Sequence, residues 1–293
     1  MHWFRRRGLF SAFHGGDAVQ DEVMTEAFTV AAFYHFSDLP DCEQVASRFR
    51  ELGERLELKG TIIFSTEGVN STLAGSAEAI EEALAWLRSD VRLAELEAKF
   101  SVTNLRPFPR FKVKVKPEIV TFRQPGADPN AAVGEYVEAK DWNALISDPE
   151  VITIDTRNDY EVQMGQFEGA VNPKTDKFED FADFVQKHLA GNKAQKVAMY
   201  CTGGIRCERA TAFLKTEGFS SVYHLKGGIL KYLESVPKSE SKWKGDCFVF
   251  DYRVGLDHDL KPAGWGISRE TGDPIALNDE ERAERDQKLM HNH

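Results

Sequence analysis

The stretch that decides the fold of this chain reads VAMYCTGGIRCER and covers residues 197–209. Its first four residues are apolar and predict a buried strand, and the two glycines after Thr202 predict a tight loop. The residues from about Cys207 to Glu217 are compatible with a helix. A strand, a short loop and a helix in this order direct backbone N–H groups and the positive end of the helix dipole towards one point. We expect the sulfur of Cys201 to lie at that point.

A thiol in such a cradle has a lowered pKa and exists as a thiolate, the form that attacks electrophiles and carries sulfur. Gly203 and Gly204 permit the positive φ angles that a cradle of successive amides requires. Arg206 adds a fixed positive charge. Alternatively, Cys201 is a small buried hydrophobe, which is the commoner role of a lone cysteine. The combined context favours the reactive role.

The composition limits the class of protein. The chain has 293 residues, enough for two domains, with 42% hydrophobic and 29% charged residues, the proportions of a soluble globular protein. No apolar run approaches the ~20 residues that span a bilayer, and the N-terminus does not read as a signal peptide. The four cysteines form no C-x-x-C or zinc spacing. We therefore expect a cytoplasmic location, no membrane partner and no metal site.

The first half of the chain predicts a ferredoxin-like α+β domain over residues 26–123, after a flexible extension over residues 1–25. Apolar patterns alternate in the order β-α-β-β-α-β, with Ser76 as the cap of the second helix. The net charge of the chain is −10, yet residues 100–126 hold six basic side chains and one acidic side chain. From position 110 basic and apolar residues alternate, so a strand places the charges on one face. This row either binds a polyanion or protects an edge strand from aggregation. As a tRNA-binding surface it would comprise Arg106, Arg110, Lys112, Lys114 and Lys116.

The second half predicts a doubly wound parallel α/β domain over residues 133–240, after a Pro- and Gly-rich linker at 124–132. The continuous apolar run at 151–154 is typical of a buried parallel strand. It ends in Asp155 and Arg157, at the sheet edge where open α/β sheets place their sites. Residues 241–267 are expected to pack on the core. The polar and charged residues 268–293 are expected to be disordered.

Four segments of this half resemble the rhodanese family: 154–157, 169–170, 201–206 and 225–228. Rhodaneses use the loop cysteine as a nucleophile that becomes a persulfide, so the resemblance gives this role to Cys201. It also implies that the terminal sulfur, or an anionic sulfur donor, binds the backbone amides of Thr202, Gly203, Gly204, Ile205 and Arg206. Asp155 and Arg157 match the end of the family's first strand and would support the loop.

Segments of both halves resemble one rhodanese-related family, the bacterial tRNA uridine hydroxylases. They are residues 60–62, 67–70, 107–108, 112–120, 201–208 and 245–254. These enzymes use dioxygen to make 5-hydroxyuridine at the wobble position of tRNA. The resemblance implies an oxygen-dependent oxidoreductase, monooxygenase-like, that acts on the anticodon loop. Members of the family carry additional cysteines near the C-terminus, whereas here Cys247 is followed by none, so metal binding by this tail is not expected.

One covalent mechanism fits these residues. The Cys201 thiolate or persulfide adds to C6 of the uracil and makes C5 electron-rich enough to react with oxygen. The chain shows no flavin or nicotinamide fingerprint, and a reductant or sulfur donor is left open. Cys207 either resolves an oxidised Cys201 through a disulfide or packs at the helix start.

Three other functions are compatible with parts of the sequence. A plain sulfurtransferase would form a Cys201 persulfide and pass the sulfur to an acceptor. A phosphatase of the related loop type needs a longer loop between cysteine and arginine than that between Cys201 and Arg206. A non-catalytic RNA- or partner-binding module would not need the intact cysteine loop.

Overall fold

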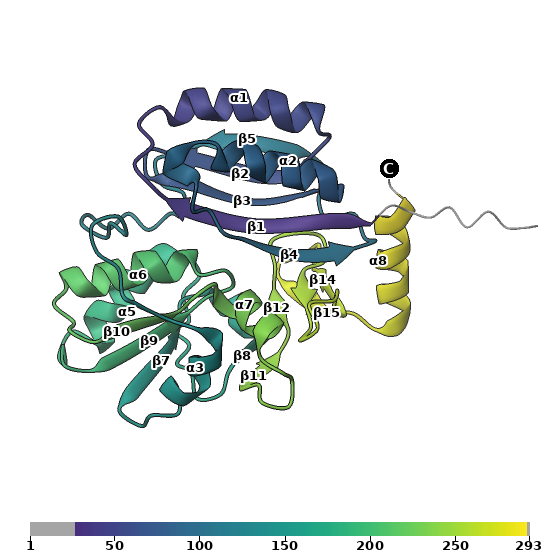
Figure 1. The fold of residues 1–293 in the computed structure, drawn as a ribbon. Helices are drawn as coiled ribbons and strands as arrows, with labels where there is room; N and C mark the ends of the chain where they lie inside the picture. Colours follow the sequence, from purple (N-terminus) through teal and green to yellow (C-terminus); the bar gives the residue numbers. More distant parts are fainter. Residues whose placement is uncertain (1–26, 292–293) are drawn as a thin grey trace, which may run out of the picture.

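The computed structural model describes residues 27–291. The predicted extension over residues 1–25 lies outside them. Two domains, one above the other in Figure 1, are followed by a C-terminal segment that contacts both. No helix in the described part of the chain is long and apolar enough to span a membrane.

The N-terminal domain is a five-stranded sheet with two helices on one face. The elements are β1 (Phe28–Phe36), α1 (Cys42–Arg55), β2 (Lys59–Ser65), β3 (Gly68–Gly75), α2 (Ala77–Arg88), the 3-10 turn η1 (Val91–Leu93), β4 (Ala98–Thr103) and β5 (Phe111–Val115). The strand order is β4-β1-β3-β2-β5, and β5 runs parallel to β2. This confirms the ferredoxin-like prediction, with the basic strand β5 added at one edge. The Ser76 side chain caps α2 by accepting a hydrogen bond from the backbone N–H of Ala79.

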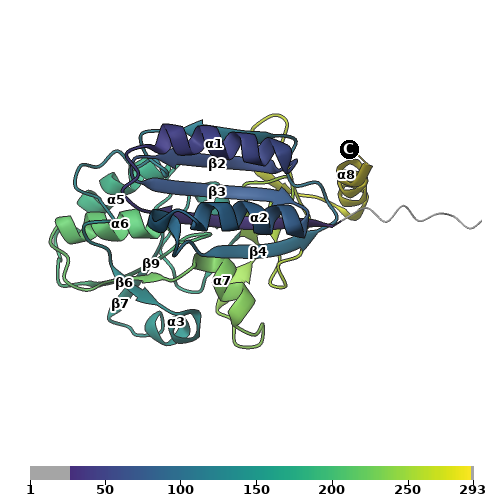
Figure 2. The same ribbon diagram turned by 45° about the horizontal axis from the view of Figure 1, so that its top comes forward.

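Both helices lie on the same side of this sheet (Figure 2). Their apolar faces pack with the alternate strand residues that point towards them, Phe49 of α1 and Phe64 of β2 among them. The opposite face carries the other alternate residues and is turned towards the second domain (Figure 1). This open face forms part of the site described below.

The second domain is built on a four-stranded parallel sheet of order β6-β10-β9-β7. Its strands are β6 (Glu135–Val137), β7 (Val151–Asp155), β9 (Lys196–Tyr200) and β10 (Val222–Leu225). α3 (Ala139–Leu145) and α7 (Gly228–Ser235) cover one face, and the turn η2 (Phe178–Asp180), α5 (Phe181–His188) and α6 (Ile205–Thr216) cover the other. Helices on both faces confirm the doubly wound prediction. The short α4 (Asp159–Val162) and β8 (Gly165–Phe167) follow β7.

The C-terminal segment contains β11 (Trp243–Gly245), β12 (Cys247–Phe248), β13 (Gly255–Leu256), β14 (Trp265–Ile267), β15 (Pro274–Ala276) and α8 (Asp279–His291). β11 pairs with β8 of the second domain, whereas the backbone N–H of Tyr252 donates to the carbonyl of Pro107 in the first. This segment therefore ties the two domains together.

The prediction of disorder from residue 268 onward was wrong for β15 and α8. Composition missed the local contacts that hold these elements. Asn278 and Glu281 bond each other's backbone N–H groups at the start of α8. The guanidinium of Arg285 donates to the carbonyls of Ala263 and Trp265, and Arg106 N–H donates to the carbonyl of Leu289. A charged helix is stabilised here by side chain-to-backbone bonds rather than by an apolar face.

Candidate active site

Cys201 follows β9 directly, and its sulfur lies in the predicted cradle. The backbone N–H of Gly204 donates to Cys201 Sγ at 3.1 Å. Gly204 has φ +105°, the left-handed conformation that orients this N–H, and α6 begins at the next residue, two positions earlier than predicted. Of the five amides predicted for the cradle, that of Gly204 thus meets the sulfur at the helix start, and Gly204 has the predicted positive φ whereas Gly203 does not.

The environment of the cysteine favours the thiolate. Burial opposes ionisation of Cys201, but the Cys207 thiol, the Arg206 guanidinium and the N–H groups of Cys207 and Gly204 together lower its pKa to about 5. Burial and the neighbouring Cys201 raise the pKa of Cys207. The two opposite shifts favour the negative charge on Cys201 and the proton on Cys207.

The loop is held from behind by α7. The N–H groups of Ile229 and Leu230 donate to the carbonyls of Cys201 and Thr202 at 2.9 and 3.1 Å. A Cβ at Gly228 would lie 2.5 Å from the carbonyl oxygen of Cys201, so only glycine fits this close approach. Gly227 and Gly228 lie in the segment 225–228 that resembles the rhodaneses. They allow the start of α7 to approach the cysteine loop, which itself precedes α6.

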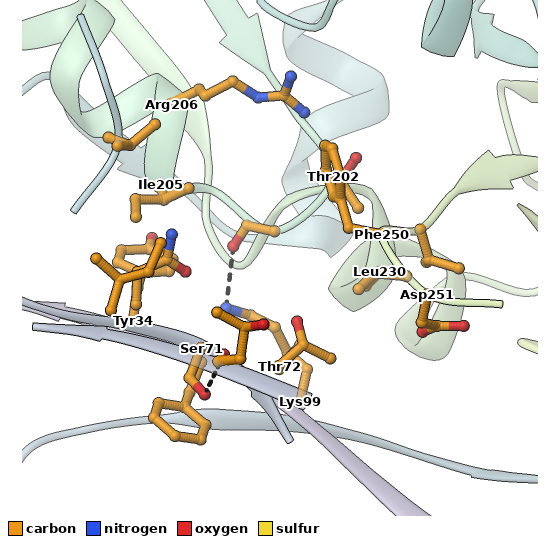
Figure 3. Close-up of a pocket in the computed structure, with 18 of the residues that line it drawn as sticks. Tyr34, Ser71, Thr72, Lys99, Thr202, Ile205, Arg206, Leu230, Phe250 and Asp251 are labelled. Atoms are coloured by element: carbon orange, nitrogen blue, oxygen red, sulfur yellow. Dashed lines mark hydrogen bonds between the residues drawn. The ribbon is translucent and has the colours of Figure 1, made fainter. Parts of the chain in front are cut away.

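The guanidinium of Arg206 is held by a buried carboxylate. It forms two hydrogen bonds, of 2.6 and 2.7 Å, with the fully buried carboxylate of Glu161, and Figure 3 shows it directed away from the sheet. Thr202 Oγ1 also lies 3.4 Å from Glu161. Sequence reasoning missed Glu161. A carboxylate three residues after the N-cap Asn158 reads as part of a capping box, which it also is.

Asp155 and Arg157 form a second buried ion pair, at 2.6 Å. Arg157 also donates to the carbonyl of Gly165 at 2.6 Å. The pair therefore fixes the turn after β7 to β8, and it bonds to Glu161 only through that residue's backbone carbonyl. That it supports the cysteine loop stays a prediction.

A cavity of about 800 Å³ lies between the cysteine loop and the open face of the N-terminal sheet. One side, which we call the loop wall, consists of Thr202, Gly203, Ile205 and Arg206. The opposite side, the sheet wall, is formed by residues of β1 to β4, with Tyr34, Thr72 and Lys99 prominent in Figure 3. Phe250, in the turn after β12, lies at the rim with 61% of its surface exposed.

Lys99 bridges the two walls. Its Nζ donates to the carbonyl of Gly203 at 3.0 Å and lies 4.9 Å from the centre of the Tyr34 ring (Figure 3). Burial lowers the pKa of Lys99, while the negative charges of Cys201 and Glu208 oppose this change. Tyr34 donates to Glu208 of α6 at 2.7 Å. Sequence reasoning missed these three residues, because nothing in the sequence indicates which strand face the second domain covers.

The Cys201 sulfur itself lies behind the loop wall. Cys201 keeps 1% of its surface exposed and does not line the cavity. A Cβ at Gly203 would meet no atom within 4 Å, so the space beside this residue is open. Gly203 is therefore the cavity-lining residue nearest in sequence to Cys201 that borders open space.

The five residues of the predicted basic surface do not all face the same way. Lys112 and Lys114 are exposed on the open face of β5, because Phe111 and Val113 pack towards α1, and Lys116 lines the cavity. Arg110 is exposed, whereas the Arg106 guanidinium donates to the carbonyls of Phe108 and Pro109. The strand register gives a continuous row of residues across the open face: Lys99, Ala32, Thr72, Thr61 and Lys112. Five strands span about 19 Å, with a lysine at each end.

Comparisons with known proteins agree with this architecture. Residues 28–119 match the UPF0176 acylphosphatase-like domain, and residues 138–235 match the rhodanese-like domain. A curated relative from Synechocystis sp., named tRNA uridine(34) hydroxylase, is 50% identical over 253 residues, which are 86% of this chain and 91% of the relative.

Two solved structures are similar to part of this chain. The rhodanese-like domain of a protein from Anabaena sp. is 21% identical, with a TM-score of 0.32, over 38% of this chain and 78% of that one. A polysulfide-sulfur transferase from Wolinella succinogenes is 25% identical, with a TM-score of 0.30, over 37% of this chain and 80% of that one.

Proposed function

This chain belongs to the tRNA uridine(34) hydroxylase family, and from that premise we propose that it is an oxidoreductase that adds a hydroxyl group to C5 of uridine 34, with O2 as co-substrate. The observation that carries the proposal is the pairing of a thiolate cradle with a cavity whose other wall belongs to the basic domain. Neither domain alone encloses that space.

The sheet wall suits a short single-stranded segment. Lys112, Lys114 and Lys116 would neutralise the backbone phosphates of the anticodon loop at the edge of the sheet. The row of residues across the open face, described above, leads from Lys112 to Lys99. Bases in such a loop are already partly unstacked, which lowers the cost of drawing one into a pocket. The exposed Phe250 ring at the rim would stack on a neighbouring base.

The cavity is of suitable size for the target base. Its volume of about 800 Å³ falls within the range of small-molecule sites, roughly 300–1,000 Å³. To reach C6 of the uracil, the Cys201 sulfur must emerge past Gly203. This movement breaks the bond between Lys99 and the Gly203 carbonyl, so the Lys99 ammonium becomes available to the base.

The first chemical step follows from these positions. The Cys201 thiolate attacks C6, and the electron pair of the C5–C6 double bond moves onto the C4 carbonyl oxygen. Lys99 would stabilise the resulting enolate by donating to that oxygen. C5 is then electron-rich and reacts with the co-substrate O2.

Sulfur transfer is the second candidate function, because the same amide cradle would stabilise a persulfide on Cys201. Thiocyanate formation from thiosulfate and cyanide, without change in tRNA nucleosides, would favour it. The low pKa of Cys201 suits both chemistries.

Nucleoside mass spectrometry of tRNA tests the proposal. A strain lacking this chain should lose 5-hydroxyuridine, and the wild-type chain and Cys42→Ser should restore it. Cys201→Ser should not, with a loss of at least a hundredfold. Unchanged 5-hydroxyuridine in the strain lacking this chain would contradict the function. Restored modification by Cys201→Ser would exclude covalent catalysis through that sulfur.

A further inference from the structure

Cys201 and Cys207 are both fully buried beside the cysteine loop. Gly204 links them: its N–H donates to Cys201 Sγ at 3.1 Å, its carbonyl accepts from the N–H of Cys207 at 3.0 Å, and both cysteine side chains belong to one buried cluster. Cys207 is the third residue of α6, and Thr156 Oγ1 lies 3.5 Å from its sulfur. The other two cysteines are elsewhere: Cys42 packs in the N-terminal core, and the Cys247 sulfur is directed to the carbonyl of Phe248.

The protonation of this pair changes when Cys201 reacts. The negative Cys201 sulfur is, after burial, the main reason for the raised pKa of Cys207. Once Cys201 is bonded to carbon, its charge is gone, while the nearby Arg206 charge still favours a Cys207 thiolate. The second thiol is thus protonated while the first acts as a nucleophile and becomes easier to ionise afterwards.

The proposed reaction requires two electrons besides those of the uridine. Hydroxylation of C5 places one atom of O2 on carbon and releases the other as water. Oxidation of two thiols to a disulfide supplies the two electrons and two protons that this water needs.

Resting on the proposed function, we propose that Cys201 and Cys207 together are the electron donor, and that Cys207 releases the product. After O2 reacts and water leaves, C5 carries a carbonyl oxygen and C6 still carries Cys201 Sγ. Cys207 Sγ then attacks Cys201 Sγ, an S–S bond forms, and the S–C6 bond breaks. Its electron pair forms the C5–C6 double bond, and the C5 oxygen takes up the proton from Cys207. One uridine, one O2 and two thiols give one 5-hydroxyuridine, one water and one disulfide, which an external thiol must reduce before the next turnover.

A single-turnover experiment tests this step. Fully reduced enzyme is freed of reductant and mixed with excess unmodified tRNA in air. We expect one 5-hydroxyuridine per enzyme, an equal amount of Cys201–Cys207 disulfide by peptide mass spectrometry, and renewed turnover on addition of dithiothreitol. Cys207→Ser and Cys207→Ala should lose at least tenfold in product and accumulate an enzyme–tRNA adduct that survives denaturation. A residue that only packs the helix start would not trap this adduct. Cys42→Ser is the matched control and should behave as wild type.

Several outcomes would overturn the inference while leaving the function intact. One is product formation without the disulfide. Another is a disulfide that forms in air equally fast without tRNA. A third is a full single turnover by Cys207→Ser. A wild-type enzyme that makes no product even with dithiothreitol would instead contradict the proposed function itself, and this inference with it.

Discussion

The two walls of the cavity are built in different ways. The loop wall comes from four of the five consecutive residues 202–206, at the point where a parallel strand meets a helix. The sheet wall comes from alternate residues of four antiparallel strands, spread over residues 30–101. The first wall directly follows Cys201, the proposed nucleophile, and can be recognised as a local motif. The second would enclose the substrate under the proposed function, and it becomes a wall of the cavity only after the two domains pack together.

We expect Glu161, which lies outside the cysteine loop, to contribute most to the stability of the loop wall. The substitution Glu161→Ala tests this. Removal of this carboxylate leaves the Arg206 guanidinium buried without its partner. We expect the free energy of unfolding to fall by about 3–5 kcal/mol. Urea denaturation followed by circular dichroism measures this change.

Glu82→Ala is the matched control for that variant. Glu82 pairs with Arg55 at the same 2.6 Å, but both side chains are more than half exposed. Its effect should stay below about 1 kcal/mol. Equal effects of the two substitutions would mean that burial of the Glu161 pair contributes nothing to the loop wall.

Substitutions of the two loop glycines distinguish backbone strain at Gly204 from substrate access at Gly203. Gly204→Ala forces a side chain into φ +105° and places its Cβ 2.6 Å from the Tyr34 hydroxyl, where the walls meet. We expect a cost of roughly 1–3 kcal/mol, and therefore a ten- to hundredfold slower hydroxylation as the cradle shifts. Gly203→Ala meets no atom and should leave the melting temperature unchanged. Slower hydroxylation by Gly203→Ala at an unchanged melting temperature would locate the substrate path at residue 203. A Gly204→Ala enzyme as active as wild type would contradict the cradle geometry.

The difference between the walls also explains what the sequence could predict. The order of strands and helices followed from apolar periodicity, and the Cys201 cradle followed from the strand-loop-helix pattern with Gly204. Periodicity shows that Lys99 and Thr72 share a face of the sheet, but not that another domain covers it. The contact between Tyr34 and Glu208 joins residues 174 positions apart, and no local signal encodes it.

The same reasoning explains the two errors. The predicted disorder after residue 268 rested on composition, whereas α8 is held by the specific bonds of Arg285 to backbone carbonyls. The reactive role that the sequence favoured for Cys201 requires an accessible sulfur, yet Cys201 is 1% exposed. A local motif gives the direction of the amides but not the depth at which the loop is buried.

The Cys201 thiolate behind the loop wall and the Lys99 ammonium on the sheet wall carry opposite charges, and the charge of Cys201 can be titrated. The pKa of Cys201 is lowered to about 5, so its thiolate should persist at neutral pH and disappear as the pH falls through 5. Any stability that the thiolate contributes is complete above the pKa of the unfolded thiol, roughly 8.5, and is lost progressively as the pH falls from there to about 5. Ultraviolet thiolate absorbance of wild type minus that of Cys201→Ser measures the transition. A midpoint near pH 8–9, the range of an ordinary thiol, would contradict the cradle.

Lys99 and Lys112, the two lysines at the ends of the row across the open face, should have different roles in the proposed reaction. Lys99 contacts the loop wall and Lys112 is exposed at the far edge of the sheet. Lys99→Met should lower kcat about tenfold, equivalent to ~1.4 kcal/mol, because it removes the cation that faces the enolate. It should leave tRNA affinity nearly unchanged.

Lys112→Met should instead weaken tRNA binding a few-fold at low salt and reduce the slope of log affinity against log salt by ~0.7, since it removes one phosphate contact on a single strand. Steady-state kinetics and binding titrations at several salt concentrations separate the two effects. If both variants changed only tRNA affinity, Lys99 would act in tRNA binding, as Lys112 does, and not in the chemical step. The sheet wall would then serve binding alone, and the enolate would need another cation.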